Sequence, residues 1–264
     1  MIFLFLFINK NNVRGVTEIY EGSGEELYRR SLDSSVLIQE GNFIVKNLIH
    51  EDEKIQAHCL RHRVFCQELG WVKSENLLEI DDYDRNAIFF GVFNENSRLL
   101  AFLRLILPDD SFMLEREFAL LIDTKYLLRK EMDTAEVSRL CVAEEARNER
   151  LVSNSGIHDI SMFLYKGVYH WCIKNDIRYL YLVAEYKIYR LLRAKGFPCR
   201  LIGQPVTMSD GVLAVAAIMD WREFEALNTA KKPEMMKWFS QYQSAPVPWQ
   251  SPGPALCLQH SASV

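Results

Sequence analysis

Two neighbouring stretches of the chain gather residue types that could do chemistry. Residues 79–84 read EIDDYD, in which four of six side chains are acidic, and residues 61–71 read RHRVFCQELGW. Like charges this close repel one another, so the acidic run is either a solvated loop or a group of carboxylates that jointly hold a cation. Aromatic ring faces also attract cations. The two stretches together indicate a candidate site for a positively charged small molecule.

Other charged and aromatic residues follow these stretches in a definite order. The spacing R-x3-F-x5-W is followed by E-x-D-x-x-D, by an arginine in LRLILP, by a phenylalanine after FMLERE, and by the motif EVSR. The residues of this set are Arg61, Phe65, Trp71, Glu79, Asp81, Asp84, Arg104, Phe118, Glu136 and Arg139. The ordered set resembles the acyl-homoserine-lactone synthases, the autoinducer synthases of bacterial quorum sensing, which have a GNAT-like acyltransferase fold. The resemblance covers about residues 43–222.

The resemblance implies an activity and its substrates. Such an enzyme moves a fatty acyl group from an acyl carrier protein, where phosphopantetheine bears it, to the amine of S-adenosylmethionine. It then closes the lactone and releases methylthioadenosine. No cofactor and no metal are expected, because S-adenosylmethionine is a substrate. The partners expected are therefore the acyl carrier protein and the small-molecule amine.

Several roles follow for the residues of the set. Phe65 and Trp71 are expected to offer ring faces to the sulfonium or the adenine, and the resemblance places Phe118 with them. Arg61 or Arg104 could pair with the carboxylate of the acceptor, or could lock the acidic loop through forked ion pairs. Both alternatives are open for the substrate-binding arginines.

The catalytic residues are expected among the carboxylates and the EVSR motif, namely Glu79, Asp81, Asp84, Glu136 and Arg139. Residues three apart on a strand point to opposite faces unless a bulge intervenes, so Glu136 and Arg139 are expected on different faces. An amine must lose a proton before it attacks a thioester, and we nominate Glu136 as the base. The alternative for Glu136 is a buried ion pair with an arginine of the set.

The segment after EVSR bears on the acyl donor. Acetyltransferases that use coenzyme A have a glycine-containing loop there, whose amides bind pyrophosphate, whereas this chain reads EEARNERLVSN. The missing glycines favour a donor carried by a protein. Acyl carrier proteins are acidic, so a basic docking face is expected, although each residue could equally be an ordinary solvated side chain. The candidates are Arg147, Arg150, Lys187, Arg190, Arg193 and Lys195.

The sequence also allows three rival interpretations. Related enzymes acylate a free amino acid, and Ala135 and Leu140 depart from the tryptophan and phenylalanine that often flank the synthase motif. A catalytically inactive domain that only binds an acyl carrier protein is a second alternative. The third is a zinc site on one helix face, from Cys59, His62 and Cys66, but no CxxC pair supplies further ligands. The retained aromatic and acidic motifs favour S-adenosylmethionine as the acceptor.

Composition narrows the class of protein. The chain has 264 residues, 49% hydrophobic and 25% charged, with a net charge of −4, which fits an ordinary globular protein and gives no reason to expect nucleic acid. No apolar run approaches the roughly 20 residues that span a bilayer. The initial run MIFLFLF lacks the basic residues and the cleavage site of a signal peptide. We expect a cytoplasmic monomer.

The pattern of elements predicts an α/β (α+β) fold. Strands are expected at 43–49, 87–93, 99–107, 135–142 and 177–184, helices at 50–69, 112–122, 156–175 and 185–196, and a terminal hairpin from 199–203 and 212–220. The resemblance makes this a three-layer GNAT-like sandwich, with a mostly antiparallel mixed sheet whose central parallel pair splays into a V-shaped cleft. The domains predicted are a weakly structured extension (1–40), the acyltransferase domain (41–225), and a helix with a disordered tail (226–264). An apolar slot for the acyl chain is expected between FLYKGVYHWC and YLYLVA.

Overall fold

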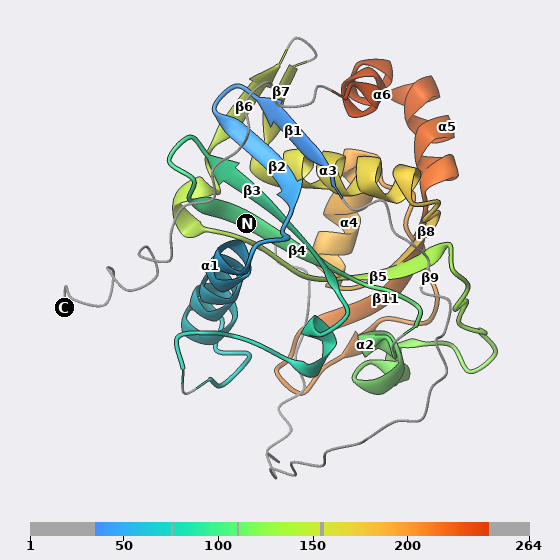
Figure 1. The fold of residues 1–264 in the computed structure, drawn as a ribbon. Helices are drawn as coiled ribbons and strands as arrows, with labels where there is room; N and C mark the ends of the chain where they lie inside the picture. The colour runs from blue at the N-terminus through green and yellow to red at the C-terminus, as the bar shows by residue number, and fades with distance from the viewer. Residues whose placement is uncertain (1–34, 75, 110, 154–155, 243–264) are drawn as a thin grey trace, which may run out of the picture.

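A twisted nine-stranded sheet forms the centre of the computed structural model, which describes residues 35–74, 76–109, 111–153 and 156–242 (Figure 1). The strand order is β1-β2-β3-β4-β5-β8-β11-β10, and β9 pairs with β11. These strands are β1 (Leu37–Glu40), β2 (Phe43–Asn47), β3 (Ile88–Asn94), β4 (Leu99–Ile106), β5 (Thr134–Val142), β8 (Tyr179–Glu185), β9 (Arg200–Leu201), β10 (Val206–Thr207) and β11 (Leu213–Asp220). A separate hairpin consists of β6 (Arg150–Ser153) and β7 (Gly156–Asp159).

Helices cover both faces of the sheet. They are α1 (Glu51–Arg61), α2 (Met113–Arg116), α3 (Ile160–Lys174), α4 (Tyr186–Lys195), α5 (Trp221–Lys231) and α6 (Pro233–Ser240). Successive residues of a strand point to opposite faces, and in β3 the ring of Phe89 meets His58 of α1 while Phe90 meets Trp171 of α3. Helices α1 and α3 therefore lie on opposite sides, and the predicted three-layer arrangement is confirmed (Figure 1).

The parallel pair of the sheet is β5 and β8. Their register runs from Thr134 opposite Tyr179 to Val137 opposite Leu182, and the pairing ends there although both strands continue. The other pairings of this sheet are antiparallel within the described residues. The predicted mostly antiparallel sheet with a parallel pair that separates along its length is thus confirmed.

Helix α3 packs very closely against β2. A Cβ atom added to Gly167 of α3 would lie 2.4 Å from Cγ2 of Val45. Such a distance is well inside van der Waals contact, so a glycine is required where the helix crosses the strand. This contact fixes the height of α3 above the sheet.

Four sequence predictions need correction. Residues 156–159 form β7 instead of the start of a helix, because Asp159 caps α3 by accepting a hydrogen bond from the backbone N–H of Met162 at 3.0 Å. The expected helix over 112–122 is only α2 and a short 3₁₀ turn at Ala119–Leu121. Instead of a single strand over 199–203, two short strands, β9 and β10, pair with β11. Strand β1 begins at Leu37, inside the predicted extension, and joins the sheet.

The C-terminal part of the described chain packs on the core. Helix α5 begins at Trp221, before the predicted boundary at 226, and buries Phe224, while α6 buries Trp238 and Phe239. Residues 1–34 of the predicted extension and the predicted tail from 243 onward lie outside the described residues. Among the helices that the structure describes, none has both the length and the apolar character needed to cross a membrane.

Candidate active site

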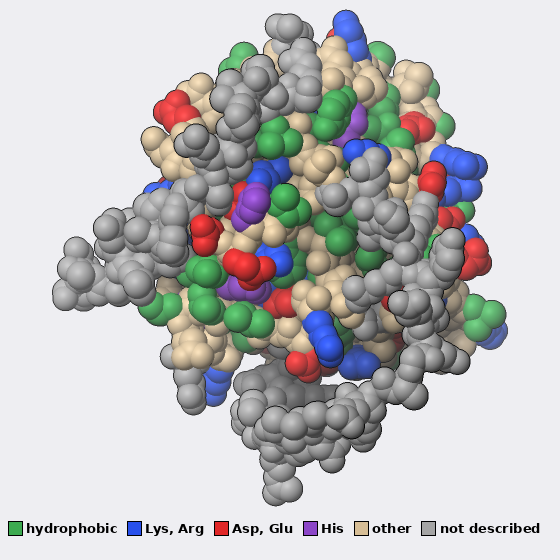
Figure 2. Space-filling model, in the orientation of Figure 1, with side chains coloured by type: hydrophobic (Ala, Val, Ile, Leu, Met, Phe, Trp, Pro, Cys, Tyr) green, Lys and Arg blue, Asp and Glu red, His purple; other side chains and the backbone are tan. Residues whose placement is uncertain are grey.

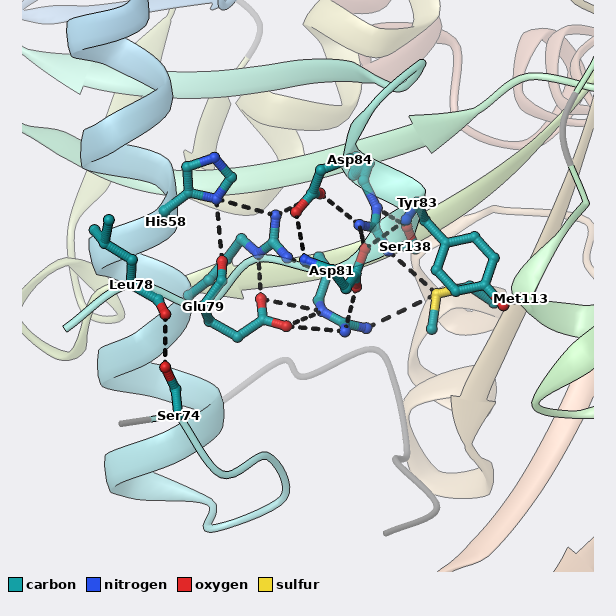
Figure 3. A network of polar contacts seen from close by, with 12 residues as sticks. His58, Ser74, Leu78, Glu79, Asp81, Tyr83, Asp84, Met113 and Ser138 are labelled. Carbon is teal, nitrogen blue, oxygen red and sulfur yellow. Dashed lines mark hydrogen bonds and ion pairs between the residues drawn. The ribbon is translucent and has the colours of Figure 1, made fainter. Parts of the chain in front are cut away.

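Three arginines and three carboxylates form a buried network on the α1 side of the sheet (Figure 3). The members are Arg61, Glu79, Asp81, Asp84, Arg104 and Arg139. Nη1 of Arg61 lies 2.7 Å from Oδ1 of Asp84, and Nη2 of Arg139 lies 2.6 Å from Oδ2 of Asp81. The sequence set of charged residues is therefore brought together in one place.

Four separate elements hold the network. Arg61 ends α1, Arg104 lies on β4, and Arg139 lies on β5, while the acids come from the loop that precedes β3. That loop is fixed by its own carboxylates: Asp81 accepts a hydrogen bond from the backbone N–H of Tyr83 at 3.0 Å, and Asp84 accepts one from the N–H of Asp81 at 2.8 Å. The motif E-x-D-x-x-D thus builds a short 3₁₀ turn that aims its acids inward.

The charges of the network balance, and this keeps the acids ionised. Burial alone would raise the pKa of Glu79, but Arg139 and Arg61 lower that pKa to about 2. Burial likewise opposes the ionisation of Asp81, and Arg139, Arg104 and Arg61 lower its pKa far below the usual value. The carboxylates do hold cations, as one sequence alternative had it. The cations are the protein's own guanidinium groups, so these three acids carry little free negative charge for a ligand.

A bulge in β5 brings Glu136 and Arg139 to the same face of the sheet. In the pairing with β4, Phe102 faces Cys141 and Arg104 faces Ser138, which leaves an extra residue on β5. Arg139 takes up this residue with a φ of +54°, in the left-handed region. The expectation that Glu136 and Arg139 point to opposite faces was wrong for this reason.

Glu136 has an environment unlike that of the other acids. It is fully buried, its Oε1 accepts the backbone N–H of Leu114 at 3.1 Å, and its Oε2 has no hydrogen-bond partner among the described residues. Burial raises the pKa of Glu136 to about 8, although the N–H groups of Met113 and Leu114 oppose the rise. No described arginine lies within ion-pair distance of Glu136, so the alternative of a buried ion pair was wrong.

The aromatic residues of the set divide into two groups. The rings of Phe65 and Trp71 stack with centroids 6.3 Å apart, and the guanidinium of Arg139 lies 5.7 Å from the Phe65 ring centre. Phe65 is buried and Trp71 is half-buried. Of the two rings, Trp71 is therefore the one that a ligand can contact. Phe118 is fully buried between α2 and the 3₁₀ turn after it, and no described polar contact joins it to the network.

Two residues of the site were missed as members by the sequence analysis. Ser138 accepts a hydrogen bond from Nε of Arg104 at 2.7 Å, and Sδ of Met113 lies 3.2 Å from Nη2 of Arg104. Met113 also lies 3.8 Å from Nη1 of Arg139. Ser138 stands inside EVSR, so its alternation with Glu136 on the strand was a signal that could have identified it.

Of the six basic residues proposed for docking, Arg147 and Arg150 follow β5 and the other four lie on α4, which follows β8. They differ in exposure and in their ion pairs. Arg150, Lys187, Arg190 and Arg193 are exposed, and Lys187 forms an ion pair with Glu185 at 2.7 Å. The other two are engaged within the fold: Arg147 pairs with Glu68, and Lys195 pairs with Asp159. Three of the four exposed basic residues, Lys187, Arg190 and Arg193, therefore lie on α4, while Arg150 begins β6.

An apolar cavity of about 50 Å³ lies on the other face of the sheet, below the separating strands. Leu180 and Leu182 of β8 and Tyr165 and Val168 of α3 contribute to its wall, as predicted from YLYLVA and FLYKGVYHWC. Leu192 of α4 also lines it, and the wall presents no nitrogen or oxygen atom to the space. Such a wall suits a hydrocarbon chain.

Comparison with known proteins agrees with the resemblance that the sequence motifs indicated. A family model described as autoinducer synthase matches residues 45–227. An acyl-homoserine-lactone synthase from Rhizobium radiobacter is 30% identical over 176 residues, which cover 64% of this chain and 80% of that protein.

Solved structures of such enzymes share the fold. The AHL synthase LasI is 19% identical, with a TM-score of 0.59 over 69% of this chain and 91% of LasI. A CoA-dependent acyl-homoserine lactone synthase, BjaI, solved with SAM and isopentyl-CoA, is 20% identical, with a TM-score of 0.58 over 69% of this chain and 82% of BjaI. At these identities the likeness establishes the fold alone.

Proposed function

Because the chain belongs to the autoinducer synthase family, it is an acyltransferase, and we propose the details of its reaction. It transfers a fatty acyl group from acyl carrier protein to the amine of S-adenosylmethionine and closes the product to an N-acyl-homoserine lactone. The observation that carries this proposal is Glu136, a buried carboxyl group beside the arginine network with one oxygen that no described residue hydrogen-bonds. Buried polar groups are nearly always hydrogen-bonded, and the amine of the acceptor can supply the partner for this oxygen.

Glu136 is the base in this proposal. S-adenosylmethionine carries a sulfonium and an ammonium group, and a cation placed beside a carboxyl group favours its ionised form. Binding of the acceptor therefore lowers the pKa of Glu136 from its resting value near 8. The carboxyl group releases its own proton to solvent, and Oε2 of the resulting carboxylate takes a proton from the ammonium. The freed amine attacks the thioester carbonyl, and the thiol of the donor leaves. The acceptor carboxylate then attacks the carbon next to the sulfonium, which closes the lactone and releases methylthioadenosine.

The network has a positioning role in this proposal. Arg104 and Arg139 are locked by Asp81 and Glu79, so Met113, which touches both guanidinium groups, is held firmly in turn. The next residue is Leu114, whose N–H holds Glu136. Glu79, Asp81, Asp84 and Arg61 thus act on the base through Arg104, Arg139 and α2. Trp71 offers its half-exposed ring to the sulfonium or adenine, stacked on Phe65, and Phe118 supports α2 from below.

In this proposal the acyl chain enters at the apolar cavity, whose walls must separate to admit it, because a volume of about 50 Å³ is far below the roughly 300–1,000 Å³ of small-molecule pockets. Val137 and Leu140 of β5 line the cavity, while Glu136 and Arg139 face the other side of the same strand. The reacting thioester would therefore lie in the gap between β5 and β8, with its hydrocarbon tail on one side and the base on the other. This arrangement separates the apolar and the charged parts of the reaction by one strand.

An acyl carrier protein is the proposed donor, since the exposed basic side chains of α4 suit an acidic partner. The test is the double variant Lys187→Glu/Arg190→Glu, assayed with matched acyl-carrier-protein and acyl-coenzyme A thioesters. The value of kcat/KM should fall with the carrier protein and stay unchanged with coenzyme A. An equal fall with both donors, or a clear preference of the unaltered enzyme for coenzyme A, would contradict the proposed donor.

Mass spectrometry tests the reaction as a whole. Purified chain, acyl donor and S-adenosylmethionine should give N-acyl homoserine lactone and methylthioadenosine, and Glu136→Gln should give neither while remaining folded. If N-acyl amino acids form instead when free amino acids are supplied, the proposed acceptor is wrong. If no acyl acceptor reacts although acyl carrier protein binds, the chain is a binding domain and the proposed catalysis is wrong.

A further inference from the structure

A second hollow, separate from the acyl cavity, opens at the ends of β2 and β3 beside α1. Its volume is about 340 Å³, which lies within the range of roughly 300–1,000 Å³ that small-molecule pockets have. Its apolar surface comes from residues at the start of β3 and from α3, including Ile88, Phe89 and Trp171. The reaction proposed above uses none of these apolar side chains.

The polar groups around the hollow are of two kinds. Arg85, which is exposed, places a positive charge at its edge, and Lys54 adds an ammonium group that also pairs with Glu51 at 2.7 Å. Asp84 also lines it, but its oxygens already accept hydrogen bonds from Arg61, Arg104 and the backbone N–H of Asp81. Arg61 and Arg104 therefore neutralise the negative charge of Asp84. Because positive charge remains at the edge of the hollow, the hollow favours an anion. Over the region of α1, charged and histidine side chains lie beside hydrophobic ones on the surface (Figure 2).

His58 supplies a hydrogen-bond acceptor to the same space. Its Nδ1 lies 3.0 Å from the carbonyl oxygen of Glu79, which can only accept, so Nδ1 carries the hydrogen and Nε2 keeps a lone pair. Burial and Arg61 lower the pKa of His58, which keeps the ring neutral. Nε2 points away from the ion-pair network (Figure 3).

We infer that this hollow binds a small aromatic carboxylate and that its occupancy regulates acyl transfer. The ring would lie on Phe89 and Ile88 with one edge beside His58, and the carboxylate would face Arg85 and Lys54. Two lining residues connect the hollow to the network: Asp84 bridges two of its arginines, and His58 holds the backbone of Glu79. A ligand that presses on either residue therefore shifts the groups that position Glu136.

The binding test uses 2-naphthoate, with 2-naphthamide as an uncharged ligand of the same shape. Isothermal titration calorimetry should give one site per chain for 2-naphthoate and weaker binding of the amide. Arg85→Glu should raise the Kd by at least about tenfold, because like charges brought together at an interface cost binding energy. Arg222→Glu, which reverses an equally exposed arginine on α5, should leave the Kd unchanged. Failure of 2-naphthoate to bind, or equal binding to the Arg85→Glu protein, would overturn the site.

The regulatory part needs a rate measurement at saturating concentrations of both substrates. Under these conditions a competitor for the acceptor or donor site loses its effect, so a change in kcat with 2-naphthoate reports the second hollow. The change should be absent in the Arg85→Glu protein, whose basal kcat stays that of the unaltered chain. An unchanged kcat despite binding would refute regulation. If the chain made no lactone at all, the proposed function would fail while the calorimetric result would still decide the site.

Discussion

The replacement Glu136→Gln gives the sharpest test of the unusual carboxyl group. Glutamine has nearly the same shape, keeps an oxygen for the N–H of Leu114, and does not titrate. Burial holds the pKa of Glu136 near 8 in the folded protein, against an ordinary value of 4.5. The folded state therefore keeps a proton that the unfolded state releases between these two values. This group contributes stability that is fully present below pH 4.5 and is lost as the pH rises through 8.

The size of the effect follows from linkage. A pKa near 8 instead of 4.5 corresponds to about 5 kcal/mol, and between pH 5.5 and pH 8 about 3 kcal/mol of this is lost. The Glu136→Gln protein does not lose this stability, because glutamine does not titrate. Relative to the unaltered protein, the variant should therefore gain about 3 kcal/mol on going from pH 5.5 to pH 8.

Urea denaturation at the two pH values measures this difference. Other groups, such as His58, titrate in both proteins and cancel in the comparison. Glu144→Gln, at an exposed glutamate, is the matched control and should show the same difference from the unaltered protein at both pH values. In the pH–rate profile, kcat/KM of the unaltered enzyme should rise towards pH 8, and the Glu136→Gln protein should be inactive throughout. A stability difference that does not change with pH would refute the buried, protonated carboxyl group.

Three further changes test the network, the cavity and the packing. Asp81→Asn leaves buried guanidinium groups partly unpaired, so it should abolish lactone formation and lower the free energy of unfolding by about 3–5 kcal/mol in urea; an active, equally stable variant would contradict the network. Leu192→Ala enlarges the apolar cavity and should lower the free energy of unfolding by about 2–5 kcal/mol. When donors of different length compete, the products should shift towards longer acyl chains. An unchanged chain-length profile would place the acyl chain elsewhere. Gly167→Ala should cost about 1–3 kcal/mol in thermal or urea unfolding because the stiff Val45 side chain cannot move aside; restoration by Val45→Ala would identify the clash, and no loss of stability would argue against it.

The order of helices and strands could be predicted from the sequence because a local pattern of residues identifies most of them. The apolar runs of β3, β4 and β8 and the stop signal of α4 at Gly196 are of this kind, and Gly196 indeed adopts a left-handed φ of 108°. Strand β1 and the hairpin of β6 and β7 gave no such signal, because they are four residues long and depend on partners. Their pairing is a property of the tertiary structure, which a short stretch of sequence does not encode by itself.

The members of the site could be predicted as a set, but their geometry could not. The backbone of Arg139 turns into the left-handed region in the middle of a buried strand, where nothing in EVSRLCV marks a bulge. This one turn places Arg139 on the same face as Glu136, and so it decides which side chains can meet. Pairing of acids with arginines from α1, β4 and β5 likewise depends on contacts across the fold.

The paired state of the acids changes which group can attract the acceptor. Three guanidinium groups neutralise the charges of Glu79, Asp81 and Asp84. The acidic run of the sequence therefore cannot itself attract a sulfonium or ammonium group. Among the buried carboxyl groups that the structure describes on this face, Glu136 has an oxygen without a hydrogen-bond partner, and it is uncharged until a cation arrives. Oε2 of Glu136 therefore both attracts the acceptor and removes its proton. The positive charge of the acceptor favours the ionised form of Glu136, and the carboxylate then deprotonates the acceptor amine. An acceptor without a second positive charge should consequently be acylated far more slowly than S-adenosylmethionine. A free amino acid that reacted as fast under the same conditions would refute this coupling.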